Sequence, residues 1–86
     1  MKIIKFSAVW CPGCLVMKKV WKEIKEEYND IEIIEYDYDL DEEEVLKYNV
    51  GQTLPVVIKE DDNNNEINRL IGEKTKQELI EFIRNW

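Results

Sequence analysis

Two cysteines stand one helical turn apart in the run Trp10-Cys11-Pro12-Gly13-Cys14, and the residues around them fix where a helix begins. Proline suits the first position of a helix, because its missing N–H would have no intrahelical partner there and its φ is already helical. Pro12 therefore predicts a helix that begins at residue 12, with Cys11 as its N-cap and Cys14 in its first turn. The preceding segment, Lys2–Ser7, is short and rich in β-formers, so the motif is expected to join a strand to a helix.

A cysteine pair at this spacing is suited to thiol–disulfide exchange, because two intervening residues let the dithiol close into a disulfide. The Cys11 sulfur would face unpaired backbone N–H groups and the positive end of the helix dipole, both of which favour the thiolate. Cys11 is therefore the predicted nucleophile, and Cys14, on the apolar side of the helix, is the predicted resolving thiol. A purely structural disulfide is the alternative, but closing so short a loop contributes only about 2 kcal/mol.

The first half of the chain predicts a strand, a helix and a second strand. The helix should run from Pro12 to about Tyr28, and the second strand from Ile31 to Tyr38. A strand–helix–strand order implies a parallel pair of strands with a right-handed crossover. Apolar residues recur along the helix at alternating spacings of three and four, and this stripe should face the core: Cys14, Met17, Trp21, Ile24 and Tyr28.

The second half predicts a short helix, a hairpin and a final helix. Asp41–Tyr48 should form the short helix, with Asp41-x-x-Glu44 resembling a capping box. Strands are expected at Leu54–Lys59 and Glu66–Ile71, antiparallel to each other and joined by a polar turn at residues 60–65. Thr75-x-x-Glu78 should cap the final helix, whose apolar residues follow at helical spacing: Leu79, Phe82, Ile83 and Trp86.

The composition favours one small domain, residues 1–86, with a modest core, since 44% of the chain is hydrophobic. The net charge of −7 and the lack of histidine argue against a nucleic-acid partner, which calls for basic patches. No apolar run is long enough to span a membrane, and the first residues turn polar too soon for a signal peptide. We therefore expect a cytoplasmic monomer with no membrane association.

Three separated features resemble the thioredoxin superfamily in its small form: the Cys11/Cys14 motif, the stretch Thr53-Leu54-Pro55, and Gly72 before the last helix. The resemblance covers essentially the whole chain. It implies an α/β, thioredoxin-like fold, in which a four-stranded mixed sheet in the order β-α-β-α-β-β-α is flanked by three helices. It also implies a thiol–disulfide oxidoreductase that acts on disulfide-bearing proteins and is restored by a separate reductase. No cofactor is implied beyond the redox-active disulfide Cys11–Cys14.

The resemblance also implies a substrate-binding surface around the motif. In relatives, the proline that matches Pro55 has a cis peptide bond and lies against the cysteine pair. The backbone of the preceding residue, here Leu54, pairs with an extended substrate segment by strand addition. Trp10 should provide an apolar rim. The expected surface consists of Trp10, Pro12, Gly13, Thr53, Leu54, Pro55 and Gly72.

One departure from the family pattern concerns a charge pair below the motif. Thioredoxins place a buried aspartate six residues before the first cysteine and pair it with a lysine on the next strand. Here Lys5 and Glu35 occupy those positions, so the charges are exchanged. Our hypothesis is that they form a partly buried pair that tunes or relays the Cys14 proton. Alternatively, both side chains reach solvent, since lysine can bury its stem and expose its head.

Other functions agree less well with the residues. Glutaredoxins, which use glutathione, share the order of elements and a similar Thr-Val-Pro stretch. However, residues 7–10, directly before Cys11, carry no positive charge, and Glu73 places acid where the glutathione carboxylates would need an anion site. A zinc site would need a dimer that shares Cys11 and Cys14, because one pair supplies two of the four ligands. A non-catalytic binding module is a further alternative, and we expect no metal.

Overall fold

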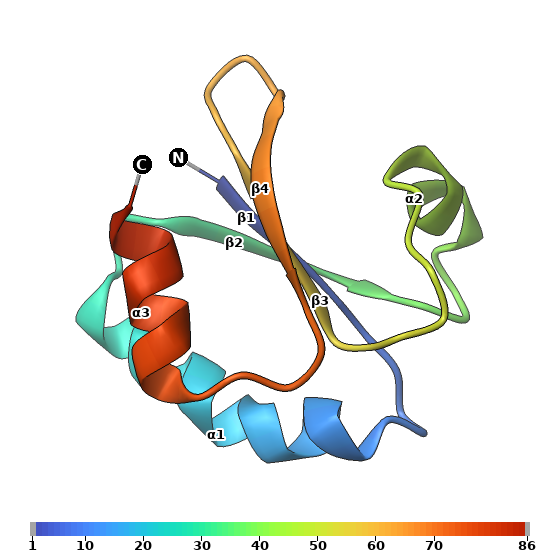
Figure 1. The fold of residues 1–86 in the computed structure, drawn as a ribbon, viewed down its shortest axis with the longest axis horizontal. Helices are drawn as coiled ribbons and strands as arrows, with labels where there is room; N and C mark the ends of the chain where they lie inside the picture. The colour runs from blue at the N-terminus through green and yellow to red at the C-terminus, as the bar shows by residue number, and fades with distance from the viewer. Residues whose placement is uncertain (1, 86) are drawn as a thin grey trace.

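The computed structural model describes residues 2–85 and folds them as strands and helices in the predicted order (Figure 1). Lys2–Ser7 forms its predicted strand, and the helix after the motif starts at Pro12 as expected. The elements of the described chain are β1 (Lys2–Ser7), α1 (Pro12–Glu27), β2 (Glu32–Asp37), α2 (Glu42–Lys47), β3 (Val56–Glu60), β4 (Glu66–Ile71) and α3 (Lys76–Arg84).

Within residues 2–85 the strands form one four-stranded sheet in the order β2-β1-β3-β4. β1 pairs with β2 in parallel, and β3 pairs with both β1 and β4 in antiparallel fashion. The expected fold class is therefore confirmed, including the parallel first pair and the antiparallel hairpin. Phe6 lies opposite Val56, and Val56 lies opposite Ile71, so β1 ends where β3 begins and β4 ends. This register sets the position of the site described below.

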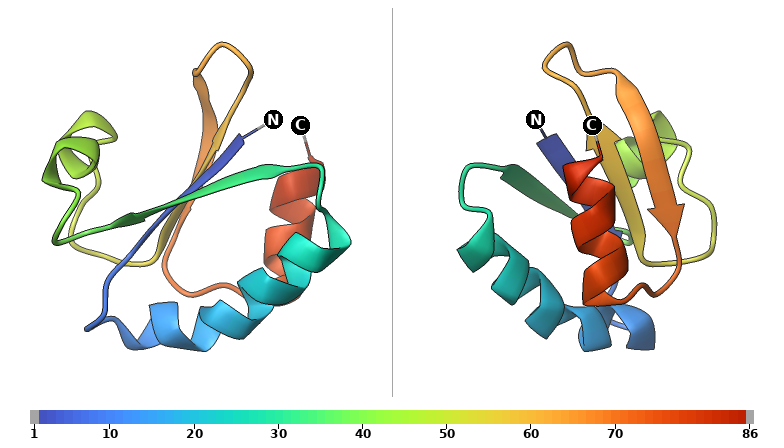
Figure 2. Two further views of the ribbon diagram at one scale, coloured as in Figure 1. Left: turned by 180° about the vertical axis from the view of Figure 1, so that it is seen from behind. Right: turned by 60° about the vertical axis from the view of Figure 1, so that its left-hand side comes forward.

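Alternation along the central strands separates two cores. Ile3 of β1 and Val57 of β3 belong to the cluster that packs against α1 and α3. Ile4 and Phe6 of β1 instead pack on the other face, where α2 and the segment after it cover them. In both views of Figure 2, α2 stands apart from α1 and α3. The domain is thus a sheet between two helical layers, and Lys5, which alternates with Ile4 and Phe6, belongs to the α1 side.

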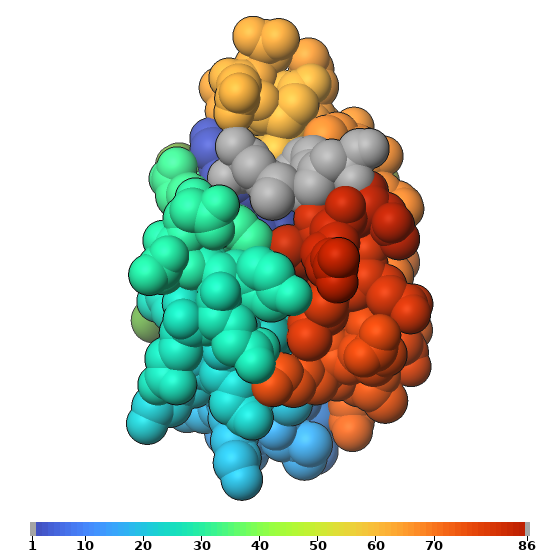
Figure 3. All heavy atoms as spheres, turned by 90° about the vertical axis from the view of Figure 1, so that its left-hand side faces the viewer, coloured from blue at the N-terminus to red at the C-terminus, as the bar shows by residue number. Residues whose placement is uncertain are grey.

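The apolar stripe of α1 is buried as predicted, at Cys14, Met17, Trp21 and Ile24. Tyr28 follows the helix as its C-cap and is half-buried against the same core. Figure 3 shows the end of α1 beside α3, and the ion pairs of Lys76 with Glu23 (3.7 Å) and Glu27 (3.4 Å) link the two helices. The Thr75 hydroxyl accepts a hydrogen bond from the Glu78 N–H at 3.1 Å, so the predicted cap of α3 is confirmed. Trp86 lies outside the described residues.

Several details of the sequence-based fold are wrong. The second strand spans Glu32–Asp37 rather than Ile31–Tyr38. The Asp41 carboxylate does not cap α2, because it accepts a hydrogen bond from the backbone N–H of Asp37 at 2.7 Å instead. The third strand begins at Val56 rather than Leu54, since Pro55 has no N–H to donate to a neighbouring strand. Glu60 belongs to that strand rather than to the turn, because it pairs with Lys2 of β1 and Glu66 of β4.

Lys59 is buried inside β3, with 2% of the residue exposed. Its ammonium donates hydrogen bonds to the backbone carbonyls of Phe82 and Asn85 and lies 4.6 Å from the Phe82 ring centroid. The last carbonyls of a helix have no intrahelical partner, so Lys59 satisfies the end of α3 from the sheet. Burial lowers the pKa of Lys59. No helix within residues 2–85 has the length and apolar character to cross a bilayer.

Candidate active site

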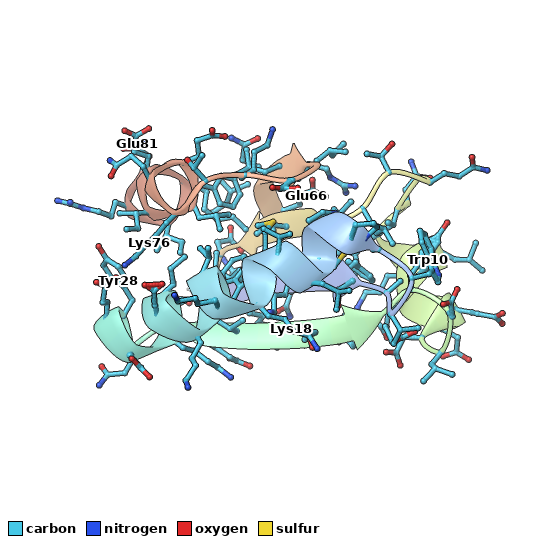
Figure 4. All side chains as sticks on the ribbon, turned by 90° about the horizontal axis from the view of Figure 1, so that it is seen from below. Trp10, Lys18, Tyr28, Glu66, Lys76 and Glu81 are labelled. Atoms are coloured by element: carbon cyan, nitrogen blue, oxygen red, sulfur yellow. The ribbon has the colours of Figure 1, made fainter. Side chains whose placement is uncertain are left out.

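The sheet register brings three distant segments to one end of the domain. The cysteine motif follows the end of β1, Pro55 precedes the start of β3, and Gly72 follows the end of β4. Cys11 and Cys14 form a small buried cluster with Ala8, against which Leu54 packs. The predicted landmarks of the substrate-binding surface therefore lie around the thiols. In Figure 4, Trp10 lies at the N-terminal end of α1 and Tyr28 at its opposite end.

Cys11 is the N-cap of α1, as its extended backbone shows (φ −91°, ψ 110°). Its sulfur accepts a hydrogen bond from the backbone N–H of Cys14 at 3.2 Å. That donor is one of the amides at the start of a helix that lack an intrahelical partner, and such contacts favour a thiolate. Both cysteines are free thiols and both are largely covered, with 4% of Cys11 and 8% of Cys14 exposed.

Burial favours the protonated form of Cys14. Burial raises its pKa from 9.0 to about 11, with further contributions from its hydrogen bond to Cys11, from the Cys11 charge and from Glu35. A protonated Cys14 can donate to the Cys11 sulfur, next to the donor on the Cys14 backbone. The two thiols are therefore chemically unequal: the Cys11 sulfur accepts a hydrogen bond from an amide at the start of the helix, and burial favours the protonated form of Cys14.

The Leu54–Pro55 peptide bond is cis, the conformation that the family resemblance implies. Pro55 is buried, Leu54 is half-buried and Thr53 is exposed. The carbonyl of Pro55 accepts a hydrogen bond from the N–H of Gly72 at 2.8 Å, which ties the start of β3 to the end of β4. Gly72 has φ +96°, a conformation that favours glycine.

Trp10 and Pro12 form the exposed rim of the motif. Trp10 is 55% exposed, and its indole N–H donates to the Asp39 carboxylate at 2.8 Å. The Tyr38 ring meets the indole edge-on, with centroids 6.1 Å apart. These contacts hold a large apolar surface next to Cys11, which suits it to contact another molecule.

Lys5 and Glu35 form an ion pair of 2.8 Å, one of the two arrangements that the sequence left open. The Lys5 side chain is 15% exposed and its ammonium lies 4.9 Å from the Trp21 ring centroid, whereas the Glu35 side chain is 57% exposed. Lys5, Glu35 and Cys14 line one cavity of about 180 Å³ between α1 and the sheet. The expected burial of the pair thus holds for its lysine and not for its glutamate, because β2 is an edge strand.

Glu73 lies directly against the motif, a position that sequence reasoning considered only as an obstacle to glutathione. A Cβ atom on Gly13 would lie 3.4 Å from Oε1 of Glu73 and 3.5 Å from Cδ of Pro55. The sequence shows that an acidic residue, Glu73, follows Gly72. The distance between Glu73 and Gly13, however, depends on the sheet register.

Among the described residues, no third metal ligand gathers with the two thiols of the site. Across residues 2–85, no group of three or more histidine, cysteine, aspartate or glutamate side chains could hold an ion. Cys11 and Cys14 alone would supply two ligands.

Comparisons with known proteins agree on one family. The family model Thioredoxin matches residues 1–85. The chain is 34% identical over 70 residues to thioredoxin H5 of Oryza sativa subsp. japonica, covering 81% of this chain but only 50% of that relative. The chain thus spans half the length of this curated relative.

Solved structures show the same fold. Thioredoxin-2 of a malaria parasite superposes with a TM-score of 0.88 at 23% identity, covering 99% of this chain and 82% of that one. Fasciola hepatica thioredoxin gives a TM-score of 0.87 at 27% identity, covering 95% of this chain and 76% of that one. The match of the family model over nearly the whole chain and the thiol pair at the start of α1 lead to one conclusion: the chain belongs to the thioredoxin family.

Proposed function

We propose that the chain is a thiol–disulfide oxidoreductase that reduces disulfides in protein substrates through a reversible Cys11–Cys14 dithiol. The observation that supports this most directly is the unequal pair of thiols. The Cys11 sulfur accepts the Cys14 N–H at the start of a helix, while burial raises the pKa of Cys14 to about 11. One sulfur is therefore prepared to attack, and the other keeps its proton until a mixed disulfide exists.

The first half of the proposed cycle forms a mixed disulfide. An extended segment of the substrate adds to the backbone beside Leu54 and Pro55, while Trp10 contacts its side chains. The Cys11 thiolate attacks one sulfur of the substrate disulfide. A Cys11–substrate bond forms, the substrate S–S bond breaks, and the second substrate sulfur leaves as a thiolate that takes up a proton.

The second half releases the substrate. Cys14 loses its proton and attacks the Cys11 sulfur, which forms the Cys11–Cys14 disulfide and breaks the bond to the substrate. The released substrate sulfur leaves as a thiolate and is protonated. The substrate has then gained two electrons from the protein and two protons, one that Cys14 gives up and one from solvent. A separate dithiol reductase returns the two electrons to the protein. The cycle needs no metal or organic cofactor, because the electrons reside on the two sulfurs.

Lys5 and Glu35 are proposed to tune the second half of the cycle as positioning residues. Their charges face the cavity that Cys14 also lines. The Glu35 carboxylate raises the pKa of Cys14, and the Lys5 ammonium, 2.8 Å from that carboxylate, offsets its effect. The pair thereby sets how readily Cys14 gives up its proton.

The first test is the equilibrium reduction potential of the pair, measured by titrating the protein in dithiothreitol redox buffers and counting free thiols. A value near about −270 mV would indicate a thioredoxin-like reductant, whereas one near about −200 mV would favour glutaredoxin-type or oxidising function. A Cys11→Ser variant is the control for thiols that react outside the pair. If wild type shows no reversible two-electron couple, the proposal is wrong.

The second test separates catalysis from plain binding. A Cys14→Ser variant should stop after the first half of the cycle and accumulate a mixed disulfide with insulin chains, visible on a non-reducing gel. Cys11→Ser should accumulate none. Reduction of insulin driven by glutathione as the sole reductant should be slow, and fast turnover there would favour a glutaredoxin-like enzyme. Failure of Cys14→Ser to trap any chain would favour a non-catalytic binding module.

A further inference from the structure

Glu73 occupies the wall of the substrate-binding surface, between the motif and the end of β4. We propose that Glu73 selects disulfide substrates that carry a lysine or arginine close to the attacked cysteine. This inference rests on the proposed function, because it names the substrates that the same site accepts.

The position of Glu73 relative to the thiols is the first support. A Cβ atom on Gly13 would meet both Oε1 and Cβ of Glu73, at 3.4 and 3.5 Å. Gly13 stands between the two cysteines in the sequence and is half-buried. The same Cβ would meet Pro55 at 3.5 Å. The Glu73 carboxylate therefore lies against the first turn of α1, which a substrate cysteine must approach, on the side of the cis-proline.

The fixed backbone around Glu73 is the second support. The preceding residue, Gly72, donates its N–H to the Pro55 carbonyl at 2.8 Å. This bond holds the Cα of Glu73 close to the start of β3, the segment beside which the substrate is proposed to add. The backbone therefore keeps the Glu73 carboxylate close to the motif.

The lack of an internal partner is the third support. Glu73 is exposed, and none of the residues 2–85 gives its carboxylate a hydrogen bond or an ion pair. Lys74 follows it in the chain but forms no ion pair with it in the described structure. Asp39, on the Trp10 side of the motif, differs because it accepts the indole N–H. Glu73 thus offers a negative charge that no side chain among residues 2–85 pairs with.

A substrate cation is the group that this charge would recognise. Strand addition uses the substrate backbone and leaves its side chains to contact the walls of the site. A lysine or arginine next to the attacked cysteine would be attracted, and an aspartate or glutamate would be repelled. An exposed pair contributes little individually, so we expect the two effects together to give about a threefold to tenfold preference for the lysine substrate over the glutamate one.

The test uses three peptides that differ in the residue beside one cysteine, which is lysine, alanine or glutamate. Each cysteine carries 2-nitro-5-thiobenzoate as a mixed disulfide, so its release on attack by the reduced protein is followed by stopped-flow absorbance. Wild type should react in the order lysine, alanine, glutamate at low ionic strength. Added salt of about 0.5 M should compress the differences, since charges at the surface are screened.

Glu73→Gln and Glu81→Gln are the matched variants. Each removes one negative charge from the whole protein, but Glu81 lies on α3, and Figure 4 shows it at the end of the domain opposite Trp10. We expect Glu73→Gln to reduce the lysine-to-glutamate rate ratio to below about twofold, whereas Glu81→Gln keeps the wild-type ratio. Glu73→Lys should invert the preference. Circular dichroism checks that each variant is folded.

Two negative results of the peptide experiment would have different meanings. If wild type reacts with none of the peptides, the proposed oxidoreductase function fails and the selectivity fails with it. If wild type reacts with all three at one rate, or if Glu73→Gln keeps the wild-type ratio, the role of Glu73 is wrong while the exchange chemistry stands.

Discussion

The protonated state of Cys14 predicts that the reduced protein loses stability at high pH. Burial and the neighbouring Cys11 raise the pKa of Cys14 from 9.0 to about 11. In the unfolded chain the thiol ionises near its ordinary value, whereas in the folded chain it keeps its proton for longer. Between these two values the folded state binds more protons, so the free energy of unfolding falls as the pH rises. The contribution is complete below pH 9 and is lost by about pH 11.

The size of the effect follows from the two pKa values. Each pH unit between 9.0 and about 11 corresponds to about 1.36 kcal/mol, so the limit is about 2.7 kcal/mol. Cys14 also lines the cavity that it shares with Lys5 and Glu35, and charges near such a space are partly screened. We therefore expect a loss of about 1–2 kcal/mol.

Urea unfolding of the reduced protein at pH 8 to 11.5 measures this loss. Cys14→Ser is the control, because it keeps the other groups that ionise in this range, including Tyr48, whose pKa burial raises. The difference in unfolding free energy between wild type and Cys14→Ser should shrink by about 1–2 kcal/mol across the window. Oxidised wild type, which has no thiol, should not show the step. Parallel pH curves for wild type and Cys14→Ser would refute the reasoning.

Other variants test single contacts. Glu35→Gln should lower the pKa of Cys14 and Lys5→Met should raise it, as read from the cysteine ¹³Cβ shift during a pH titration; shifts in the same direction would contradict the proposed tuning. Thr75→Ala should cost about 1 kcal/mol of unfolding free energy in urea, and an unchanged midpoint would show that the cap contributes nothing. Lys59→Met leaves two carbonyls at the end of α3 without their donor and should cost about 1–3 kcal/mol in the same assay; stability equal to wild type would mean that water caps the helix.

Local chemistry explains which parts of the fold could be predicted. Pro12 marks the start of α1 and Thr75 the cap of α3, because each effect needs only neighbouring residues. Asp41 misled the prediction, since a nearby backbone N–H, that of Asp37, competes for its carboxylate. Burial of Lys59 escaped prediction because a lysine in a short strand gives no sign that the end of a helix lies above it.

The candidate site divides in the same way. The N-cap position of Cys11 is a local property of the motif, so the residues near it predict the donor to its sulfur. The burial that raises the pKa of Cys14 depends on the whole core. Likewise, the exposure of Glu35 follows from the place of β2 at the sheet edge, and the approach of Glu73 to Gly13 follows from strand register. Neither the exposure of Glu35 nor the position of Glu73 can be predicted from the neighbouring residues alone.

The sheet register also gives the site an order of assembly. The two thiols precede Pro55 and Gly72 in the chain by about forty residues or more, yet these later segments close the site around them. While the chain is being synthesised, both thiols therefore emerge well before the hairpin that covers them. Until the segment before β3 has been made, Leu54, which packs against the thiol cluster in the folded domain, cannot cover them. A chain stalled before β3 would therefore carry both thiols without Leu54 and Pro55, the residues that lie beside the motif in the folded domain.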